Sequence, residues 1–158
     1  MKIWQLLISL MFWSYSISQI NIVDVGDGWK GKVQQALDTI QKYDTVKYNN
    51  LITKCNNIGY WNNTFATTEP PHTILIPTSE MNFGNIYNIC AILIHESYHL
   101  LIYGRNMNPS QEEYWAYSYE LDFLMKVPNV DEWLIQNAQN KINYFYLYKV
   151  TNEKILAQ

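Results

Sequence analysis

Two histidines and a glutamate occur within one short stretch, His95-Glu96-Ser97-Tyr98-His99. Residues four apart on an α-helix project from the same face, one turn from each other. Both imidazoles can therefore reach one ion at about 2 Å, the usual zinc–nitrogen distance. Glu96 follows the first histidine, so its carboxylate should lie beside the ion, where it can take a proton from a water molecule. The stretch thus predicts a hydrolytic metal site.

The alternative is a helix whose two histidines and glutamate bind no metal. The surrounding residues, among them Ile89, Leu93, Ile94 and Leu100, are apolar. Burying Glu96 beside two unliganded histidines in so apolar a helix is unfavourable without a counter-charge. The metal-binding interpretation is therefore the one that we favour.

The pattern His-Glu-x-x-His resembles the signature of the zincin metallopeptidases. One branch of that family has a glycine three residues after the second histidine and a third histidine three residues later. Ile102 and Arg105 occupy those positions here, so that branch is excluded. The chain instead resembles the small gluzincins, in which a glutamate from a later helix binds the metal. The resemblance covers roughly residues 73–126 and implies Zn²⁺ as the cofactor.

A catalytic zinc ion needs a third protein ligand and keeps its fourth position for water. The segment after Gly104 offers Glu112, Glu113 and Glu120. Glu113 is followed three residues later by Ala116, which is similar to the Glu-x-x-Ala third-ligand segment of many small gluzincin-like proteins. The resemblance therefore implies that Glu113 completes the site with the two histidines.

Glu113 also has a structural interpretation. Ser110 and Glu113 have the spacing of a capping box, in which each side chain bonds the backbone amide of the other residue. That role would occupy Glu113 and leave Glu112 or Glu120 for the metal, so the third ligand stays open. The chain also departs from the thermolysin-like pattern, because Tyr117 stands where an aspartate would follow Glu113. The residue that orients a ligand histidine is therefore not identified.

The resemblance implies a metallopeptidase that cleaves a peptide or protein substrate. Zinc would lower the pKa of its water, and Glu96 would act as the general base. Tyr117 is the first candidate for the donor that stabilises the oxyanion. His72 could supply that donor or another ligand, although a lone histidine beside two prolines is more often just exposed. Two alternatives are a zinc-dependent amidase and a secreted, non-catalytic binding module that retains the motif.

Composition narrows the remaining function classes. The formal net charge is −3 and no dense run of Lys or Arg occurs, which argues against nucleic acid as the main partner. The sequence has no Gly-x-Ser-x-Gly elbow and no Gly-rich phosphate loop. Ser97 lies inside the metal motif, and Cys90 faces elsewhere on the helix, so a serine or cysteine nucleophile is not expected. The oligomeric state stays open.

The first 18 residues are typical of an export signal. Lys2 is basic, Ile3–Phe12 is mostly apolar, and Ser16-Ile17-Ser18 offers small residues for cleavage before Gln19. An uncleaved anchor is the alternative, but the apolar stretch is shorter than the roughly 20 residues that span a bilayer. We therefore expect a secreted or periplasmic protein with no stable membrane insertion after cleavage.

Only two cysteines occur, Cys55 and Cys90. In an exported protein two cysteines can form one disulfide, whereas the alternative is a pair of buried thiols. Export favours the disulfide.

The elements that must position these residues follow from the hydrophobic periodicity. Apolar spacing predicts helices that begin near residues 29, 85, 110 and 131 and end near residues 43, 103, 125 and 148. The β-branched residues 73–77 predict a strand between prolines, and two further strands are possible between residues 58 and 67. Residues 44–57 are ambiguous, and residues 78–84 are expected to form a loop.

Residues 19–158 should form one domain, since no linker or repeat divides them. The pattern of elements indicates an α+β fold. The zincin resemblance further implies a small sheet over the central metal-binding helix, with additional helices packed around it. In that arrangement the strand at 73–77 would be the edge strand that borders the cleft.

Overall fold

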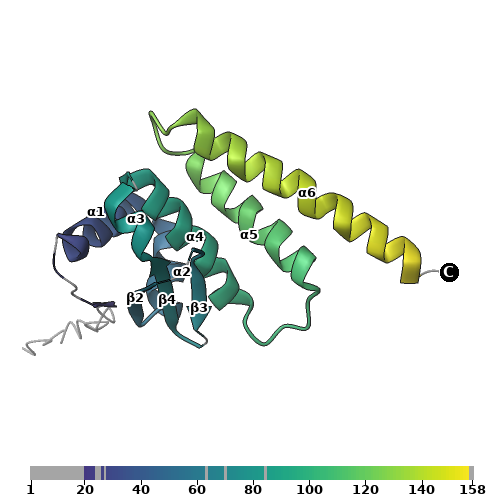
Figure 1. Cartoon of the computed structure of the whole chain (residues 1–158), viewed down its shortest axis with the longest axis horizontal. Coiled ribbons are helices and arrows are strands. Elements are labelled where there is room, and N and C mark those ends of the chain that lie inside the picture. The colour runs from purple at the N-terminus through teal and green to yellow at the C-terminus, as the bar shows by residue number, and fades with distance from the viewer. Residues whose placement is uncertain are drawn as a thin grey trace, which may run out of the picture.

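A computed structural model describes residues 20–156, apart from residues 24, 25, 27, 63, 70 and 84. The export signal predicted for residues 1–18, with its cleavage before Gln19, lies outside the described residues. The described part of the chain forms six helices and a mixed four-stranded sheet, so the predicted α+β class is confirmed (Figure 1). No helix in this part is long and apolar enough to cross a membrane.

The sheet has the strand order β1-β2-β4-β3. β1 pairs in parallel with β2, β2 pairs in parallel with β4, and β3 runs antiparallel to β4. The strands are β1 (Asn21–Ile22), β2 (Asn57–Trp61), β3 (Thr67–Glu69) and β4 (Thr73–Pro77). The strand predicted at 73–77 is thus confirmed, and the first of the two possible strands before it corresponds to β2. The second lies later than predicted, because β3 begins only at Thr67.

The predicted place of β4 at the edge of the sheet is wrong. β4 lies between β2 and β3, and Ile74 and Ile76 are fully buried, as suits an interior strand. Only residues 70–72 separate β3 from β4, so these two strands pair as a hairpin, while β2 occupies the other side of β4. In the described sheet, β3 is therefore the edge strand beside the helices.

The four predicted helices are present, and two further helices appear between them. The predicted ones are α1 (Trp29–Tyr43), α4 (Ile86–Ile102), α5 (Pro109–Leu124) and α6 (Glu132–Leu156). The additional ones are α2 (Thr45–Lys54) and α3 (Thr78–Phe83). Asn49 and Asn50 make α2 a weak helix by propensity, but the Asp44 carboxylate caps it by accepting from the Lys47 amide at 3.0 Å.

Helix α4 is the central element that carries the histidine motif. Asn85 caps its start, with Oδ1 accepting from the Asn88 amide at 2.8 Å, and Gly104 follows its end with a φ of 84°. Its side chains at Leu93 and Ile94 are fully buried. The helix packs against the sheet and α1 and α2 on one side and against α5 on the other (Figure 1). Burial on both sides explains its nearly continuous apolar sequence.

Helix α5 begins differently from the prediction. Asn108 is the N-cap, its Oδ1 accepts from the Ser110 amide at 2.9 Å, and Pro109 is the first helical residue. The alternative in which Ser110 and Glu113 form a capping box is therefore wrong. Because the cap lies two residues earlier, the Glu113 carboxylate is available to the interior of the protein.

Helix α6 returns along α5 and continues beyond the residue where α5 begins (Figure 1). Leu134 and Ala138 are the buried residues of its first turns, whereas Trp133 is 54% exposed. The turn before it contains Asn129 at a φ of 58°, a conformation that asparagine tolerates better than most residues. The two helices thus form an antiparallel pair that covers α4.

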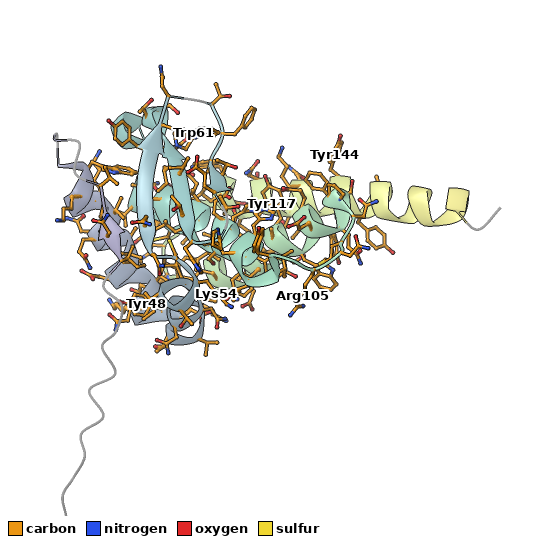
Figure 2. All side chains as sticks on the ribbon, turned by 90° about the horizontal axis from the view of Figure 1, so that it is seen from below. Tyr48, Lys54, Trp61, Arg105, Tyr117 and Tyr144 are labelled. Atoms are coloured by element: carbon orange, nitrogen blue, oxygen red, sulfur yellow. The ribbon has the colours of Figure 1, made fainter. Side chains whose placement is uncertain are left out.

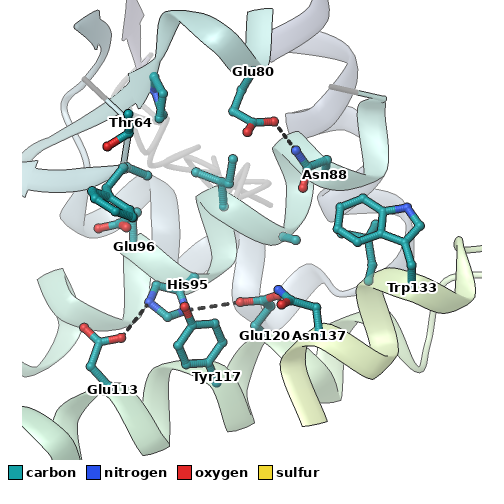
Figure 3. A pocket seen from close by; sticks show the side chains of 16 residues that line it. Thr64, Glu80, Asn88, His95, Glu96, Glu113, Tyr117, Glu120, Trp133 and Asn137 are labelled. Carbon is teal, nitrogen blue, oxygen red and sulfur yellow. Dashed lines mark hydrogen bonds and ion pairs between the residues drawn. The ribbon is translucent and has the colours of Figure 1, made fainter. Parts of the chain in front are cut away.

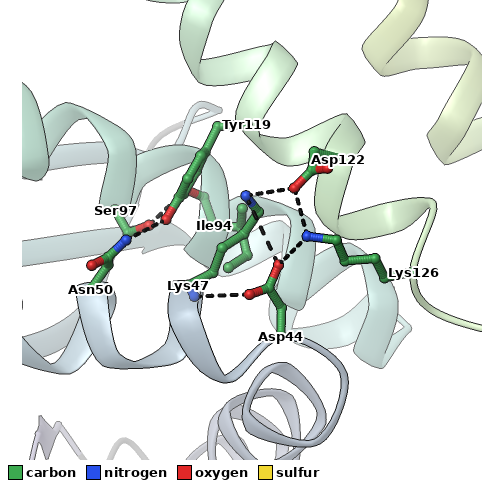
Figure 4. Close-up of polar contacts among 8 residues, drawn as sticks. All are labelled: Asp44, Lys47, Asn50, Ile94, Ser97, Tyr119, Asp122 and Lys126. Carbon is green, nitrogen blue, oxygen red and sulfur yellow. Dashed lines mark hydrogen bonds and ion pairs between the residues drawn. The ribbon is translucent and has the colours of Figure 1, made fainter.

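A group of charged side chains, which we call the lysine network, joins α2 to α5 (Figure 4). Lys47 Nζ lies 2.9 Å from Asp122 Oδ2, and Lys126 Nζ lies 2.8 Å from both Asp122 Oδ2 and Asp44 Oδ2. Lys47 is buried and its ammonium also lies 3.5 Å from the centre of the Tyr119 ring. The network fixes the second half of α5 on the body of the protein.

The favoured disulfide between Cys55 and Cys90 is wrong in this structure. Both are free, buried thiols, and each lies beside a different backbone carbonyl, Cys55 beside that of Asn57 and Cys90 beside that of Ala36. Burial raises the pKa of each thiol to about 12. Both therefore behave as apolar core residues and not as reactive thiolates.

Candidate metal centre

The three residues predicted as ligands converge between α4 and α5. His95 Nε2 lies 3.3 Å from His99 Nε2. The Glu113 carboxylate faces both rings, with Oε2 3.4 Å from His95 Nε2 and Oε1 3.5 Å from His99 Nε2. Among the described residues, these three form the one group of histidine, cysteine and acidic side chains placed to share a metal ion.

These separations fit a tetrahedral zinc site. Ligand atoms that lie about 2.0–2.2 Å from zinc, at the tetrahedral angle to one another, are about 3.3–3.5 Å apart. The two Nε2 atoms, 3.3 Å apart, fall in that range, each Nε2 lies 3.4–3.5 Å from a different oxygen of the Glu113 carboxylate, and one ligand atom from each of the three residues lies within 4.8 Å of the other two. Two imidazole nitrogens and one carboxylate are also the donor set of known catalytic zinc sites. The residues present therefore fit a zinc ion with one position left for water or substrate.

Each candidate histidine ligand presents its other ring nitrogen to a separate glutamate. His95 Nδ1 lies 3.1 Å from Glu120 Oε2, and His99 Nδ1 lies 3.4 Å from Glu112 Oε1. An ionised carboxylate can only accept a hydrogen bond, so it suits the tautomer in which Nδ1 carries the proton. With a metal ion in place of a proton at the centre of the cluster, that tautomer leaves each Nε2 lone pair free to bind the metal.

The three glutamates considered as the third ligand lie at different positions around the histidines. Glu113 faces the Nε2 atoms, whereas Glu112 and Glu120 lie behind the histidines and orient their rings. The geometry thus favours Glu113 as the third ligand, and Glu120 fills the orienting role that the sequence left without a residue. Glu120 could have been identified from the sequence, because it lies seven residues after Glu113 and residues seven apart on a helix lie on the same face.

The local structure of α5 explains why these side chains reach α4. Glu113, Tyr117 and Glu120 are spaced four and three residues apart, which places them on one face of the helix. Ala116 is fully buried beside them, and its small side chain lets α5 approach α4 closely, as the Glu-x-x-Ala pattern suggested. The cap at Asn108 leaves the first turn regular, so Glu113 points from this face to the histidines.

The cluster carries more negative than positive groups. Burial favours neutral His95, but hydrogen bonds with Glu113 and Glu120 outweigh this effect and raise its pKa to about 9. Burial and the positive charge of His95 lower the pKa of His99. Burial raises the pKa of Glu120, whose side chain is only 7% exposed. The cluster therefore attracts one positive charge to its interior, which either a proton or a metal ion can supply.

Glu96 lies beside the ligands and lines the same cleft. It is buried, and burial together with repulsion from Glu113 and Glu120 raises its pKa to about 7, although the charge of His95 opposes the shift. A carboxylate with a pKa near the working pH is well suited to accept and then return a proton. This is the position and the property expected of the general base.

Tyr117 also stands against the cluster, as its prediction as an oxyanion donor requires. Its ring meets that of His95 edge to face, with centroids 4.3 Å apart, and stacks on Phe145 of α6 at 5.9 Å. Burial raises the pKa of its hydroxyl, so the group stays protonated and can donate a hydrogen bond. In the view of Figure 2, Tyr117 lies near the middle of the molecule, between Tyr48 on one side and Tyr144 on the other.

The cluster opens into a cleft of about 510 Å³ (Figure 3). One wall is made by Phe65 and Ala66, which lead into the edge strand β3, and by Pro77 at the end of β4. The opposite wall is made by α4, α5 and the start of α6, including Trp133. Such a volume is typical of ligand sites and accommodates a few residues of a peptide.

Other residues considered from the sequence lie away from the centre. His72 is exposed, and its Nδ1 lies 2.9 Å from the Lys54 carbonyl, outside the cleft. Ser97 is fully buried and donates to the Ile94 carbonyl at 2.8 Å, so it is no nucleophile. The walls formed by Phe65 and Trp133 were not predicted, because residues so distant in sequence carry no local signal of their shared cleft.

No protein-family model matches the sequence, and no curated protein or solved structure matches it either.

Proposed function

We propose that this protein is a zinc-dependent hydrolase, and specifically a metallopeptidase of the zincin type. The observation that carries the proposal is the convergence of His95 Nε2, His99 Nε2 and the Glu113 carboxylate at separations of 3.3–3.5 Å. The glutamates behind both histidines support it, because metal-binding histidines almost always donate their second nitrogen to such a partner.

His95, His99 and Glu113 would hold the ion, and zinc bound there would supply a Lewis acid that polarises a carbonyl and lowers the pKa of a water molecule. Glu96 takes the proton from the attacking water and later passes it to the leaving nitrogen. The Tyr117 hydroxyl donates to the oxyanion that develops on the substrate carbonyl. Glu112 and Glu120 keep the histidine rings in their binding tautomer throughout.

The edge strand supports a peptide as substrate. β3 has one neighbour, β4, in the described sheet, and the residues just before it, Phe65 and Ala66, line the cleft. An extended peptide can add to such an edge through main-chain hydrogen bonds, which would lay its backbone along the cleft. A zinc-dependent amidase would need the same ligands, and only the substrate separates the two activities.

The N-terminal sequence adds export to the proposal. A protein that acts in the periplasm or outside the cell would leave its signal behind and work as residues 19–158. Mass spectrometry of the protein recovered from the periplasm or medium tests this, and a start at Gln19 is the expected result.

The metal proposal is tested by elemental analysis of the purified wild-type protein and two variants. We expect about one zinc per chain in the wild type and no retained zinc in Glu113→Ala. Glu112→Ala, the matched control one residue away, should retain zinc with weakened affinity. Zinc lost from Glu112→Ala and kept in Glu113→Ala would overturn the ligand assignment.

Turnover is tested separately on a library of internally quenched peptides. Hydrolysis by the zinc-loaded protein, abolished in Glu96→Gln, is the expected result. Full zinc occupancy without hydrolysis of any peptide or amide would identify a binding module that retains the motif.

A further inference from the structure

We propose that the end of the cleft distant from the metal ligands is a subsite for a cationic side chain of the substrate, with Glu80 as its counter-charge. This inference rests on the proposed function, because it assigns specificity to the same cleft. The substrate class it selects is a peptide with lysine or arginine beside the cleaved bond. The composition of the cleft wall at this end supports the proposal (Figure 3).

Three helices meet at this end of the cleft. Glu80 comes from α3, Asn88 from the first turn of α4, and Trp133 and Asn137 from the first turns of α6. Glu80 accepts a hydrogen bond from the Asn88 amide through Oε2. This contact orients the Glu80 carboxylate without neutralising it, since an amide is a neutral donor. In Figure 3 the Glu80 and Asn88 side chains lie across the cavity from His95 and Glu120.

Acidic side chains outnumber basic ones in the lining of the cleft. Its described lining includes four glutamates, Glu80, Glu96, Glu113 and Glu120, and no lysine or arginine. Glu113 and Glu120 face His95, and Glu96 lies beside them. No ion pair joins Glu80 to a cationic group among the described side chains, whereas Glu113 and Glu120 each lie against His95. Glu80 therefore remains as a negative charge that a substrate can neutralise.

The remaining lining suits the stem and the head of a long cationic side chain. Ala91 and Ile92 of α4 and Leu134 of α6 provide apolar contacts for methylene groups. Trp133 lines the cleft and is 54% exposed, so its ring is accessible to a ligand. A cation held over an indole ring gains attraction from the ring electrons, more than over any other side chain. A carboxylate and an indole at one end of a cleft thus favour an ammonium or guanidinium group.

The same wall disfavours other residues at this subsite. An acidic side chain would meet the Glu80 carboxylate as a like charge, which raises the free energy of the complex. An uncharged apolar side chain would remove water from Glu80 without giving it a partner. Lysine and arginine are the residues that satisfy both the carboxylate and the apolar stem.

The first experiment measures binding and needs no turnover. The zinc-loaded Glu96→Gln protein is titrated by calorimetry with Nα-acetyl-lysine methylamide and with Nα-acetyl-norleucine methylamide, which has a similar stem but no charge. We expect the lysine compound to bind about tenfold more tightly, and the preference to disappear when Glu80→Gln is added. Asp38→Asn, which removes an exposed carboxylate of α1, is the matched control and should keep the preference.

Equal affinity for the two compounds, or a lysine preference that survives Glu80→Gln, would overturn the subsite. Trp133→Leu gives an independent variant if Glu80→Gln does not fold, and it should reduce the preference severalfold. The second experiment uses wild-type protein and paired peptides with lysine or norleucine beside the cleaved bond. Here Glu80→Gln should raise KM for the lysine peptide with little change in kcat.

The two proposals fail in distinguishable ways. Lysine-selective binding without hydrolysis would support the proposed subsite and reject the proposed peptidase activity. Hydrolysis of lysine and norleucine peptides at equal rates would support the proposed peptidase activity and reject the proposed subsite.

Discussion

Two clusters of charged side chains hold α5 against the rest of the protein, and their charges are balanced differently. The lysine network has two lysines and two aspartates, so the chain itself neutralises every charge (Figure 4). The candidate metal centre has four glutamates, Glu96, Glu112, Glu113 and Glu120, around two histidines. A buried excess of negative charge is unfavourable unless a cation joins it.

This difference separates a structural cluster from a candidate functional one. The lysine network needs no further partner, and it lines a shallow hollow apart from the cleft. The metal centre lies at the cleft, with ligand atoms whose separations fit one ion. Charge balance therefore distinguishes the two clusters more clearly than burial does, since both contain side chains that are almost fully buried.

The largest expected effect comes from removing the general base while the ligands stay in place. Glu96→Gln should lower kcat by about a hundred- to ten-thousand-fold, because proton transfer by a positioned base contributes that much. Its zinc content should remain at the wild-type level. His95→Ala should lose both zinc and activity. An active Glu96→Gln protein would contradict the mechanism.

A smaller effect is expected from the glutamate behind His95. Glu120→Gln should weaken zinc affinity about 10- to 100-fold, as changes to groups that orient metal ligands typically do. Competition with a chromogenic chelator measures the affinity. Glu69→Gln, at the end of the edge strand and outside the cluster, is the control and should bind zinc as the wild type does. Unchanged affinity in Glu120→Gln would show that the contact with His95 Nδ1 has no role in metal binding.

Breaking the lysine network should affect stability and leave zinc binding intact. Lys47→Met should reduce the free energy of unfolding by about 2 kcal/mol, less than for a fully severed buried pair, because Lys126 still contacts both aspartates. Lys126→Met should cost less than about 1 kcal/mol, since its side chain is 44% exposed. Urea denaturation of zinc-loaded protein measures both. A zinc-free Lys47→Met protein would show that the two clusters are coupled.

As the pH falls, the metal centre should lose zinc before the lysine network is disrupted. Zinc binding requires unprotonated histidines, whose ordinary pKa is about 6.5, so zinc should be released first as the pH falls. Burial raises the pKa of Asp44, but contacts with Lys126 and Lys47 outweigh it, and the pKa lies below its ordinary value of 3.8. A lowered folded-state pKa adds stability above pH 3.8 that is lost only as the pH falls through the lower value. Zinc content and circular dichroism should therefore change in two separate steps, and one shared transition would contradict this order.

The metal-binding helix and the candidate ligands were predictable because their information is local. His95 and His99 are four residues apart inside an apolar helix, and both the spacing and the helix follow from a single stretch of sequence. The strand at 73–77 was predictable for the same reason, since β-branched residues between prolines have few alternatives. Helix α2 was not, because its stability comes from the Asp44 cap and from packing and not from its propensity.

Several features were decided only by the tertiary structure. The edge strand is β3 and not β4, because strand order depends on which segments pair across the sheet and not on the residues of one strand. The separate places of Glu112, Glu113 and Glu120 depend on how α5 is rotated against α4. The free thiols of Cys55 and Cys90 likewise depend on the positions of α2 and α4 in the core.

The sequence by itself determined the chemistry that this protein can hold: two imidazoles one helical turn apart, a carboxylate beside them, and glutamates on a following helix. The tertiary structure decided which glutamate faces the centre, which strand borders the cleft and that Glu80 and Trp133 share its far end. The physical reason is the separation along the sequence over which each effect acts. Helix periodicity acts over a few residues, whereas the packing of α3, α5 and α6 around α4 brings together residues more than 50 positions apart.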